Sequence, residues 1–288
     1  MNAPLRDSVQ KESPKPSTDY VGFIDEAKPS RWAVKNQHLR ECLAEFFGTW
    51  IIIAFGMAVN NQVGLSGEKD GTFLSINLSW GIAIMLAVHA TEGVSGSDLN
   101  PAVSVTKAVF GRLAWWKVPG YCVAQLLGAF VGAWCIFLLH KNTLDAQDPE
   151  RTAATFVHFA THPAAHITHA TACYTEFLGT AMLTLGIFAL TDKKNRPASP
   201  FALPINFFLL IAAIGMSFGM NTGYALNPAR DLGPRLMLSM AGWGSQVFTA
   251  YDYYFWIPLI APFFGGVAGG VLYKGFIEIH HPQQTLPQ

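Results

Sequence analysis

The chain has 288 residues, of which 51% are hydrophobic and 13% are charged, about half of the roughly 25% charged residues in a typical soluble domain. Nineteen Lys and Arg residues balance nineteen Asp and Glu residues, so the chain lacks the basic surplus that a nucleic-acid-binding protein needs. The high apolar content and the four cysteines also exclude a chain disordered throughout and a disulfide-rich secreted scaffold, which leaves a membrane protein or an unusually apolar soluble one.

Residues 1–39 are polar and rich in Pro, Ser and Lys, and they predict a disordered cytoplasmic tail with no cleaved signal peptide. Beyond this tail, long stretches carry almost no charge, and a helix needs about 20 mostly apolar residues to cross a bilayer. Six segments meet this requirement: 41–63, 73–91, 114–139, 171–191, 201–222 and 254–277. The sequence therefore predicts a polytopic membrane protein with six transmembrane helices.

Basic residues concentrate in alternate connections between the apolar segments. Lys and Arg precede the first segment and follow the second, the fourth and the sixth, whereas the opposite connections hold few of them. Because cytoplasmic connections of membrane proteins carry the excess of basic residues, both termini are predicted to face the cytoplasm. We expect a multi-pass protein of the plasma membrane that ends in a short cytoplasmic tail at residues 280–288.

The two halves of the chain carry the same motifs in the same order. The first half contains AEFFGT around Glu45 and an Asn-Pro-Ala that begins at Asn100. The second half contains TEFLGT around Glu176 and an Asn-Pro-Ala that begins at Asn227. Each half has three apolar segments, an odd number, so the second half must be inverted relative to the first. An inverted repeat with interrupted apolar segments in matching places indicates a transport path at the membrane midplane.

Each Asn-Pro-Ala is predicted to begin a short helix, because Asn is a good N-cap and Pro fits the first helical position. Two such half-helices that enter from opposite faces would meet at mid-bilayer with their N-termini together. The positive ends of their dipoles would repel protons and cations, and the two Asn amides would donate to a passing oxygen. The residues of the two motifs are Asn100, Pro101, Ala102, Asn227, Pro228 and Ala229.

The motifs AEFFGT, SGSDLNPAV, TEFLGT and GYALNPARDLGPR, in this order and spacing, resemble those of the major intrinsic protein (aquaporin) family over residues 40–279. The resemblance implies an all-α membrane protein with six transmembrane helices and two re-entrant half-helices in a right-handed bundle. The inverted 3+3 repeat would have its first copy at about 40–140 and its second at about 170–279. The resemblance also implies one pore in each subunit and a homotetramer.

The same resemblance places an outer constriction at Trp80, Gly215, Tyr224 and Arg230. Water-selective members resemble Phe, His, a small residue and Arg at these points, whereas the residues of this chain resemble the glycerol-conducting branch. Gly215 is predicted to widen the constriction by the volume of an imidazole. Trp80 and Tyr224 are predicted to form an apolar wall, and Arg230 to donate hydrogen bonds to the hydroxyl groups of a polyol.

Four acids are expected to support the pore. Acids within a membrane are suspected of function, but Glu45 and Glu176 match family residues that accept hydrogen bonds from the backbone of the re-entrant loops, which is a structural role. Asp231, with Arg235 after it, resembles the glycerol-conducting branch and is predicted to brace its half-helix. Asp98 stands where the family usually has His. The resemblance places it near Glu176, where two acids would give flux a weak pH dependence on the acid side.

The longest outer connection, residues 141–169, contains four histidines: His158, His162, His166 and His169. Their spacing would suit one helical face that binds Zn²⁺ or senses pH, but Pro163 interrupts such a helix and no Cys or carboxylate completes a ligand set. A solvated loop with no metal is therefore favoured. The cysteines lie in or beside apolar segments, which predicts small core residues without disulfides: Cys42, Cys122, Cys135 and Cys173.

These residues favour a passive channel that conducts glycerol and water and excludes protons and ions, with no cofactor and no enzymatic activity. Urea, hydrogen peroxide, ammonia and uncharged metalloid acids are further candidate solutes that the sequence does not rank. A coupled transporter would not need the paired Asn-Pro-Ala motifs, and Gly215 disfavours a water-selective channel. A structural or adhesive membrane protein with a closed pore is the remaining alternative. The expected surroundings are a lipid bilayer, with no nucleic-acid partner.

Overall fold

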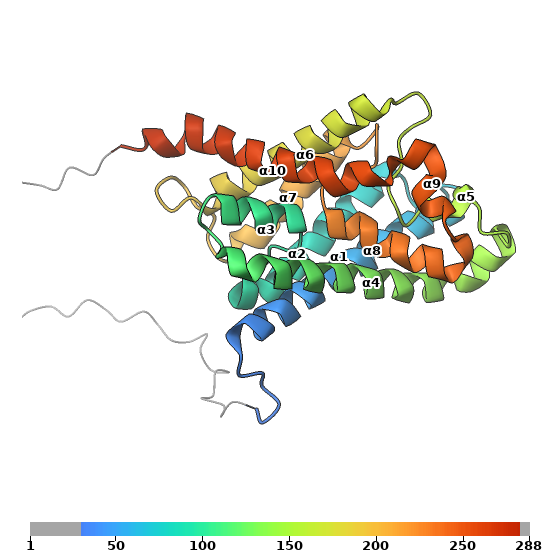
Figure 1. The fold of residues 1–288 in the computed structure, drawn as a ribbon, viewed down its shortest axis with the longest axis horizontal. Coiled ribbons are helices and arrows are strands. Elements are labelled where there is room, and N and C mark those ends of the chain that lie inside the picture. The colour runs from blue at the N-terminus through green and yellow to red at the C-terminus, as the bar shows by residue number, and fades with distance from the viewer. Residues whose placement is uncertain (1–29, 283–288) are drawn as a thin grey trace, which may run out of the picture. The chain divides into compact units, whose positions relative to one another are not determined.

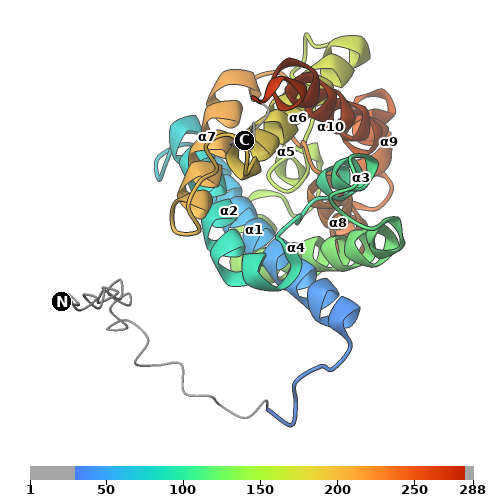
Figure 2. The ribbon, with the colours of Figure 1, turned by 90° about the vertical axis from the view of Figure 1, so that its left-hand side faces the viewer.

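A computed structural model describes residues 30–282, and every regular element among them is a helix (Figures 1 and 2). The chain divides into two units, Met1–Lys35 and Asn36–Gln288, and all of these helices belong to the second unit. The tail predicted at residues 1–39 lies largely outside the described residues, so its disorder stays a prediction. Helix α1 already begins at Gln37, where the Asn36 side chain accepts a hydrogen bond from the Leu39 N–H at 3.0 Å.

Six long helices form the body of the second unit, and each coincides with one of the predicted apolar segments. They are α1 (Gln37–Leu65), α2 (Phe73–Ser95), α4 (Val118–Gln147), α6 (His169–Thr191), α7 (Ala202–Phe218) and α10 (Ile257–Phe276). In the part of the chain that the structure describes, five helices are long and apolar enough to cross a membrane, and α7 is a shorter apolar helix of 17 residues. The predicted fold class is thus confirmed.

Two short helices begin at the Asn-Pro-Ala motifs: α3 (Pro101–Val109) and α8 (Pro228–Leu238). Figure 2 shows both among the long helices, and they contact each other. The remaining elements are short and lie in the connections. They are η1 (Trp115–Lys117), α5 (Ala153–Phe156), η2 (Ser239–Trp243), α9 (Gln246–Tyr253), η3 (Tyr254–Trp256) and η4 (Glu278–His280).

The two halves pack in the same way, with α1 along α4 in the first half and α6 along α10 in the second. Glycines allow these close approaches. A Cβ at Gly128 of α4 would lie 2.3 Å from the carbonyl oxygen of Phe46, and one at Gly265 of α10 would lie 2.2 Å from that of Phe177. Small residues at helix contacts are typical of membrane bundles, where backbones must approach closely to gain packing energy. The internal repeat therefore extends from the motifs to the helix packing.

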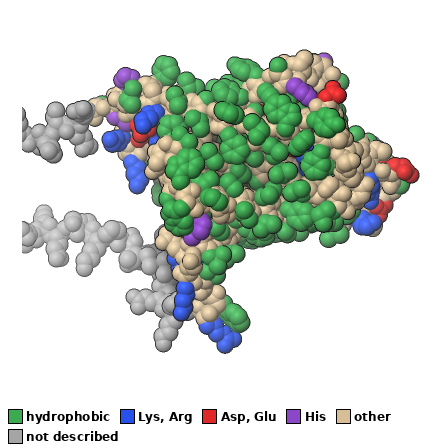
Figure 3. Space-filling model, viewed as in Figure 1, with side chains coloured by type: hydrophobic (Ala, Val, Ile, Leu, Met, Phe, Trp, Pro, Cys, Tyr) green, Lys and Arg blue, Asp and Glu red, His purple; other side chains and the backbone are tan. Residues whose placement is uncertain are grey.

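The outer surface of the bundle is apolar over the faces of its long helices. Figure 3 shows hydrophobic side chains over most of the visible face and charged side chains mainly towards its two ends. Large side chains on these faces are exposed, among them Leu127 of α4 at 51% and Phe264 of α10 at 67%. A surface of this kind suits a hydrocarbon surrounding, since soluble proteins rarely expose large continuous apolar patches. The chain is an integral membrane protein.

Candidate functional site

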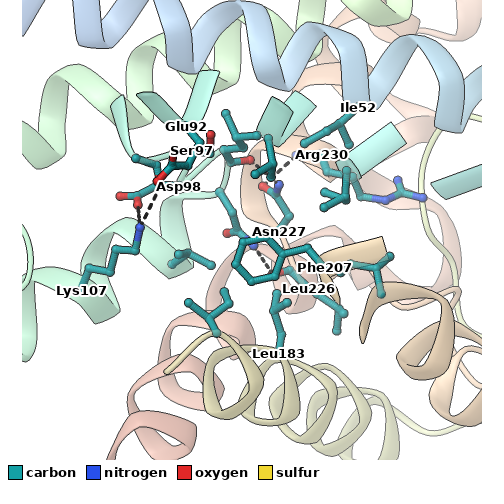
Figure 4. Close-up of a pocket in the computed structure, with 18 of the residues that line it drawn as sticks. Ile52, Glu92, Ser97, Asp98, Lys107, Leu183, Phe207, Leu226, Asn227 and Arg230 are labelled. Atoms are coloured by element: carbon teal, nitrogen blue, oxygen red, sulfur yellow. Dashed lines mark hydrogen bonds and ion pairs between the residues drawn. The ribbon is translucent and has the colours of Figure 1, made fainter. Parts of the chain in front are cut away.

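A cavity of about 300 Å³ lies between the two halves of the bundle (Figure 4). Its walls come from α1, α2, α3, α6, α7 and α8 and from the loops that precede α3 and α8. Apolar side chains such as Ile52 and Leu183 line much of it. Figure 4 shows Asp98 and Lys107 on one side of the cavity and Arg230 on the other. The cavity therefore combines an apolar wall with charged groups at separate positions.

The side chains of Asn100 and Asn227 cap the two half-helices. Asn100 Oδ1 accepts a hydrogen bond from the Ala102 N–H at 2.8 Å, and Asn227 Oδ1 accepts from the N–H groups of Ala229 at 3.0 Å and Arg230 at 3.2 Å. The proline of each motif occupies the first helical position, where the missing N–H leaves no bond unmade. Both Asn-Pro-Ala motifs thus begin helices, as predicted from their sequence.

Each of these Asn side chains is also fixed by the opposite half of the chain. Asn100 Nδ2 donates to the carbonyl oxygen of Leu226 at 2.8 Å, and Asn227 Nδ2 donates to that of Leu99 at 2.8 Å. The N-termini of α3 and α8 are therefore held together by a reciprocal pair of hydrogen bonds. An amide nitrogen carries two N–H groups, so one from each Asn is left to donate to a molecule in the cavity.

Two fully buried glutamates anchor the loops that lead into the half-helices. Glu45 of α1 accepts hydrogen bonds from the N–H groups of Asp98 at 3.0 Å and Leu99 at 2.6 Å. Glu176 of α6 accepts in the same way from Ala225 at 3.0 Å and Leu226 at 2.8 Å. Irregular backbone at membrane depth has no water to bond, so it must find its acceptors within the protein. By accepting these N–H groups, the two carboxylates fix the backbone of the loops, which is a structural role.

The anchored loops hold non-glycine residues in the left-handed region of the backbone map. The residue before each Asn has a positive φ, 52° at Leu99 and 53° at Leu226, and so does the third residue before it, 48° at Ser97 and 42° at Tyr224. Each such residue costs on the order of 1–3 kcal/mol and persists only where its surroundings fix it. The glutamate bonds supply that constraint, and the left-handed turns aim the carbonyl groups of Leu99 and Leu226 at the opposite Asn.

The surroundings of Asp98 differ from those predicted. Its carboxylate forms an ion pair with Lys107 of α3, and its backbone N–H donates to Glu45. The prediction that Asp98 lies near Glu176 is wrong, because each glutamate binds a different loop. The loop that contains Asp98 donates its N–H groups to Glu45, and Glu176 binds the loop before α8. With a lysine as its partner, Asp98 no longer supports the predicted acid-side pH dependence.

Trp80 and Arg230 lie together in the cavity wall. The guanidinium carbon of Arg230 lies 4.6 Å from the centre of a Trp80 ring, and Arg230 Nη1 donates to the Phe159 carbonyl at 3.4 Å. Trp80 Nε1 donates to Asn60 Oδ1 at 3.1 Å, which fixes the plane of the indole. An aromatic face and a positioned cluster of N–H donors therefore stand side by side, as the sequence led us to expect.

Gly215 lies behind Tyr224 rather than on the cavity surface. A Cβ at this position would lie 2.6 Å from Tyr224 Cζ and 2.1 Å from Asn77 Oδ1, while Tyr224 itself lines the cavity. The expectation that Gly215 widens the constriction by the volume of an imidazole is therefore wrong, because these two side chains fill the space. Gly215 is instead what allows the Tyr224 ring to pack against α7.

Asp231 braces α8 against the outer connection. Its Oδ1 accepts hydrogen bonds from the N–H and the hydroxyl of Thr161 at 2.8 and 2.6 Å, and its Oδ2 accepts from Arg235 Nε at 2.5 Å. Arg235 Nη2 donates to the Thr161 carbonyl at 2.5 Å. Asp231 and Arg235 are both buried, so this ion pair links the outer loop to the half-helix that carries Arg230.

The outer histidines do not share a helical face, since α5 ends at Phe156. His166 is exposed, His158 is half-buried, and His162 stacks on Tyr251 with ring centres 5.6 Å apart. Burial lowers the pKa of His158 to about 4 and also lowers the pKa of His162. Within residues 30–282, no three His, Cys, Asp or Glu side chains group so as to hold a metal ion, and all four cysteines are free thiols.

Sequence reasoning missed three polar residues that complete the loop anchors. Gln125 Nε2 donates to Glu45 at 2.8 Å and to Ser104 Oγ at 3.1 Å, and the Thr222 hydroxyl donates to Glu176 at 2.7 Å. The third is Thr161, which binds Asp231. Gln125 lies in an otherwise apolar predicted span, where a polar residue indicates a partner inside the bundle. Thr222 and Thr161 lie in loops, where no such signal marks them.

A sequence model of the major intrinsic protein family matches residues 32–273. Aquaporin-7-2 of Laccaria bicolor is 41% identical over 287 residues, which cover 94% of this chain and 86% of the relative. Aquaporin-9 of Homo sapiens is 40% identical, and the match covers 88% of this chain and 88% of the relative. Aquaglyceroporin-2 of Rhizophagus irregularis is 39% identical, and the match covers 94% of this chain and 90% of the relative. The crystal structure of the aquaglyceroporin from Plasmodium falciparum superposes with a TM-score of 0.77 at 31% identity, over 84% of this chain and 98% of that one.

Proposed function

Because the chain belongs to the major intrinsic protein family, we propose that it is a passive channel that conducts glycerol, other small uncharged solutes and water. Proteins of this family are channels rather than enzymes, and the relatives described above bear the names aquaporin and aquaglyceroporin. Conduction down a gradient requires no covalent chemistry, which is consistent with a cavity whose walls are largely apolar. Protons and ions are excluded.

The observation that carries this proposal is the meeting of two helix N-termini at the cavity. Asn100 and Asn227 each donate one amide N–H to a carbonyl of the opposite half, and the second N–H of each can donate to a solute oxygen. The partial positive charges at the two N-termini oppose the passage of cations and of protons carried along a water chain. A neutral molecule with hydroxyl groups gains hydrogen bonds here without that electrostatic cost.

The proposed selectivity filter consists of Trp80, Gly215, Tyr224 and Arg230. The two aromatic side chains offer an apolar wall to the CH edge of a polyol, and the guanidinium offers N–H donors to its hydroxyl edge. Gly215 acts through Tyr224, since it makes the room in which that ring packs. Urea, hydrogen peroxide and uncharged metalloid acids are proposed as further solutes, because they are small, neutral and polar.

The proposed setting is the plasma membrane, with both termini in the cytoplasm and four copies in a homotetramer, each with its own pore. The proposed channel domain covers residues 40–279 as two inverted repeats, flanked by the tails 1–39 and 280–288. The excess of basic residues on one side of the predicted topology supports this orientation. Native mass spectrometry in detergent tests the tetramer, and protease protection of tags at the two termini tests the orientation.

Stopped-flow light scattering on proteoliposomes tests the function. We expect glycerol and water permeabilities well above those of protein-free vesicles, with a low activation energy and no increase in proton leak measured by a trapped pH dye. Matched vesicles that contain Arg230→Ala should lose discrimination between glycerol and larger polyols. Fast water flux with glycerol flux no faster than in protein-free vesicles would contradict the proposed solute, and flux of neither would contradict the channel.

A further inference from the structure

Asn77 is a fully buried polar residue on the inner side of α2, three residues before Trp80. Its Nδ2 donates to the Phe73 carbonyl one turn earlier at 2.8 Å, so its Oδ1 points away from that turn. Oδ1 has no hydrogen-bond partner among residues 30–282. A buried acceptor without a partner is destabilising, so Oδ1 is expected to have one.

The hydroxyl group of Tyr224 is a second buried polar group without a partner in the described residues. Both oxygens lie beside one point on α7, the position that a Cβ on Gly215 would occupy. Asn77 Oδ1 is 2.1 Å from this point and the Tyr224 oxygen is 2.8 Å from it. The acceptor and the hydroxyl therefore lie no farther apart than the sum of these two distances, and neither has another partner among the described residues.

The ring of Tyr224 is held between glycines of α7 and the first turns of α2. A Cβ at Gly219 would lie 2.6 Å from Tyr224 Cδ1 and 2.9 Å from Phe73 Cζ, just as one at Gly215 would meet Tyr224 Cζ. One side of the ring thus packs on two glycines one turn apart, while the residue lines the cavity. The side of the ring that faces α7 is therefore closed, whereas the residue borders open space at the cavity.

From this arrangement we infer that Asn77 is a positioning residue of the constriction, which accepts the hydroxyl hydrogen of Tyr224 and keeps the ring against α7. The inference rests on the proposed function, since it concerns how the filter distinguishes glycerol from water. Asn77 directs the hydroxyl of Tyr224 away from the solute, so that the ring presents an apolar surface. In this constriction a tyrosine then acts towards the solute as a phenylalanine would.

Loss of the Asn77 carbonyl should narrow the solute path beside Tyr224. Without the Asn77 carbonyl, the buried hydroxyl turns to the nearest water, which is in the cavity, and the ring follows it. A ring displaced into the cavity obstructs glycerol more than the smaller water molecule. Because one ordinary hydrogen bond contributes about 1 kcal/mol, we expect the glycerol-to-water permeability ratio to fall about fivefold when Asn77 is replaced by Leu.

A double-mutant cycle of wild type, Asn77→Leu, Tyr224→Phe and the double variant tests the inference in proteoliposomes. In the Tyr224→Phe background, Asn77→Leu should change the permeability ratio and the activation energy of glycerol flux far less than it does in the wild type. Asn77→Leu should lower the ratio, and adding Tyr224→Phe should restore it, because the displaced hydroxyl is then gone. Asn61→Leu is the matched control, since Asn61 is also buried, also donates to the carbonyl four residues earlier and also leaves its Oδ1 without a partner among the described residues.

Additive effects of the two substitutions would overturn the inference, because they would mean that Asn77 does not act through the Tyr224 hydroxyl. The unfolding temperatures of the four proteins in detergent report the contact without reference to flux, and the absence of coupling there would also overturn it. A wild type without glycerol flux would contradict the proposed function instead. Should Asn77→Leu fail to fold, the same cycle with Asn77→Ala decides by the same criterion of coupling with Tyr224→Phe.

Discussion

The glutamate anchor of the second re-entrant loop should be sensitive to the loss of a single acceptor oxygen. In Glu176→Gln the side chain keeps its shape, but an NH₂ group replaces one carboxylate oxygen. Whichever way the amide turns, it meets a backbone N–H, because one oxygen binds Ala225 and the other binds Leu226. The Thr222 hydroxyl can rotate to adapt, whereas a backbone N–H cannot.

The size of the effect follows from these contacts. A hydrogen bond to a charged group contributes about 1.5–3 kcal/mol, and a buried donor left without an acceptor costs about 1–3 kcal/mol. We therefore expect Glu176→Gln to lower the free energy of unfolding by about 3–5 kcal/mol, which corresponds to a drop of about 5–8 °C in unfolding temperature for a chain of this size. Flux should fall as well, since the same loop positions Tyr224.

Intrinsic-fluorescence melting in detergent, combined with glycerol flux in vesicles, measures both effects. Glu45→Gln should behave like Glu176→Gln, because it too sets an amide against two backbone N–H groups. Glu150→Gln is the control, since this acid is exposed and its replacement should change stability little. A loss below about 1 kcal/mol in Glu176→Gln would refute the argument that the carboxylate constrains the loop.

Three further predictions follow from the packing and the outer loops. Gly265→Ala should cost about 1–3 kcal/mol in detergent melting, because the new Cβ meets the Phe177 carbonyl. Gly275→Ala in the same helix is the control, since its Cβ meets nothing within 4 Å and should be tolerated. Equal effects of the two substitutions would contradict the close approach of α6 and α10. Asp231→Asn should cost about 3–5 kcal/mol, since it leaves the Arg235 guanidinium buried without its charge partner. Asp145→Asn removes an acid from a more exposed pair and should change stability far less; similar costs at the two sites would contradict this. Burial lowers the pKa of His158 from 6.5 in the unfolded chain to about 4 in the fold, so the unfolded state binds the proton first and stability should fall as the pH drops from about 6.5 to about 4. His158→Gln should flatten the dependence of unfolding temperature on pH over that range, and an unchanged slope would show that other groups cause it.

The features predicted from sequence are those that local chemistry determines. The apolar segments predicted the ends of the six long helices to within four residues, because the bilayer thickness sets their length, except that α4 continues to Gln147, eight residues past the predicted end. The caps at Asn100 and Asn227 depend only on an Asn, a Pro and the residues that follow them. Glu45 and Glu176 were found because an acid within an apolar span requires a partner.

The features that were not predicted depend on which side chains meet across the bundle. Asp98 carries no local sign that Lys107, nine residues later, is its partner. Gly215 was interpreted by comparison with a missing histidine, and only the packing of α2 against α7 reveals that Asn77 and Tyr224 fill the space. Thr161 reaches Asp231 from a connection seventy residues earlier, a separation that sequence spacing does not encode.

The central claim is that Trp80, Gly215, Tyr224 and Arg230 form the selectivity filter. The most direct test adds a side chain at Gly215, with and without the Tyr224 ring that fills the space beside it. Glycerol and water permeabilities are compared for wild type, Gly215→His and the double variant Gly215→His/Tyr224→Ala in stopped-flow measurements on proteoliposomes. The wild type should conduct glycerol and water, and Gly215→His should block both, because its Cβ collides with the Tyr224 ring and with Asn77. In the double variant the histidine gains room, so water flux should return while glycerol flux stays low. Glycerol flux that survives Gly215→His undiminished would contradict the assignment of this constriction as the filter.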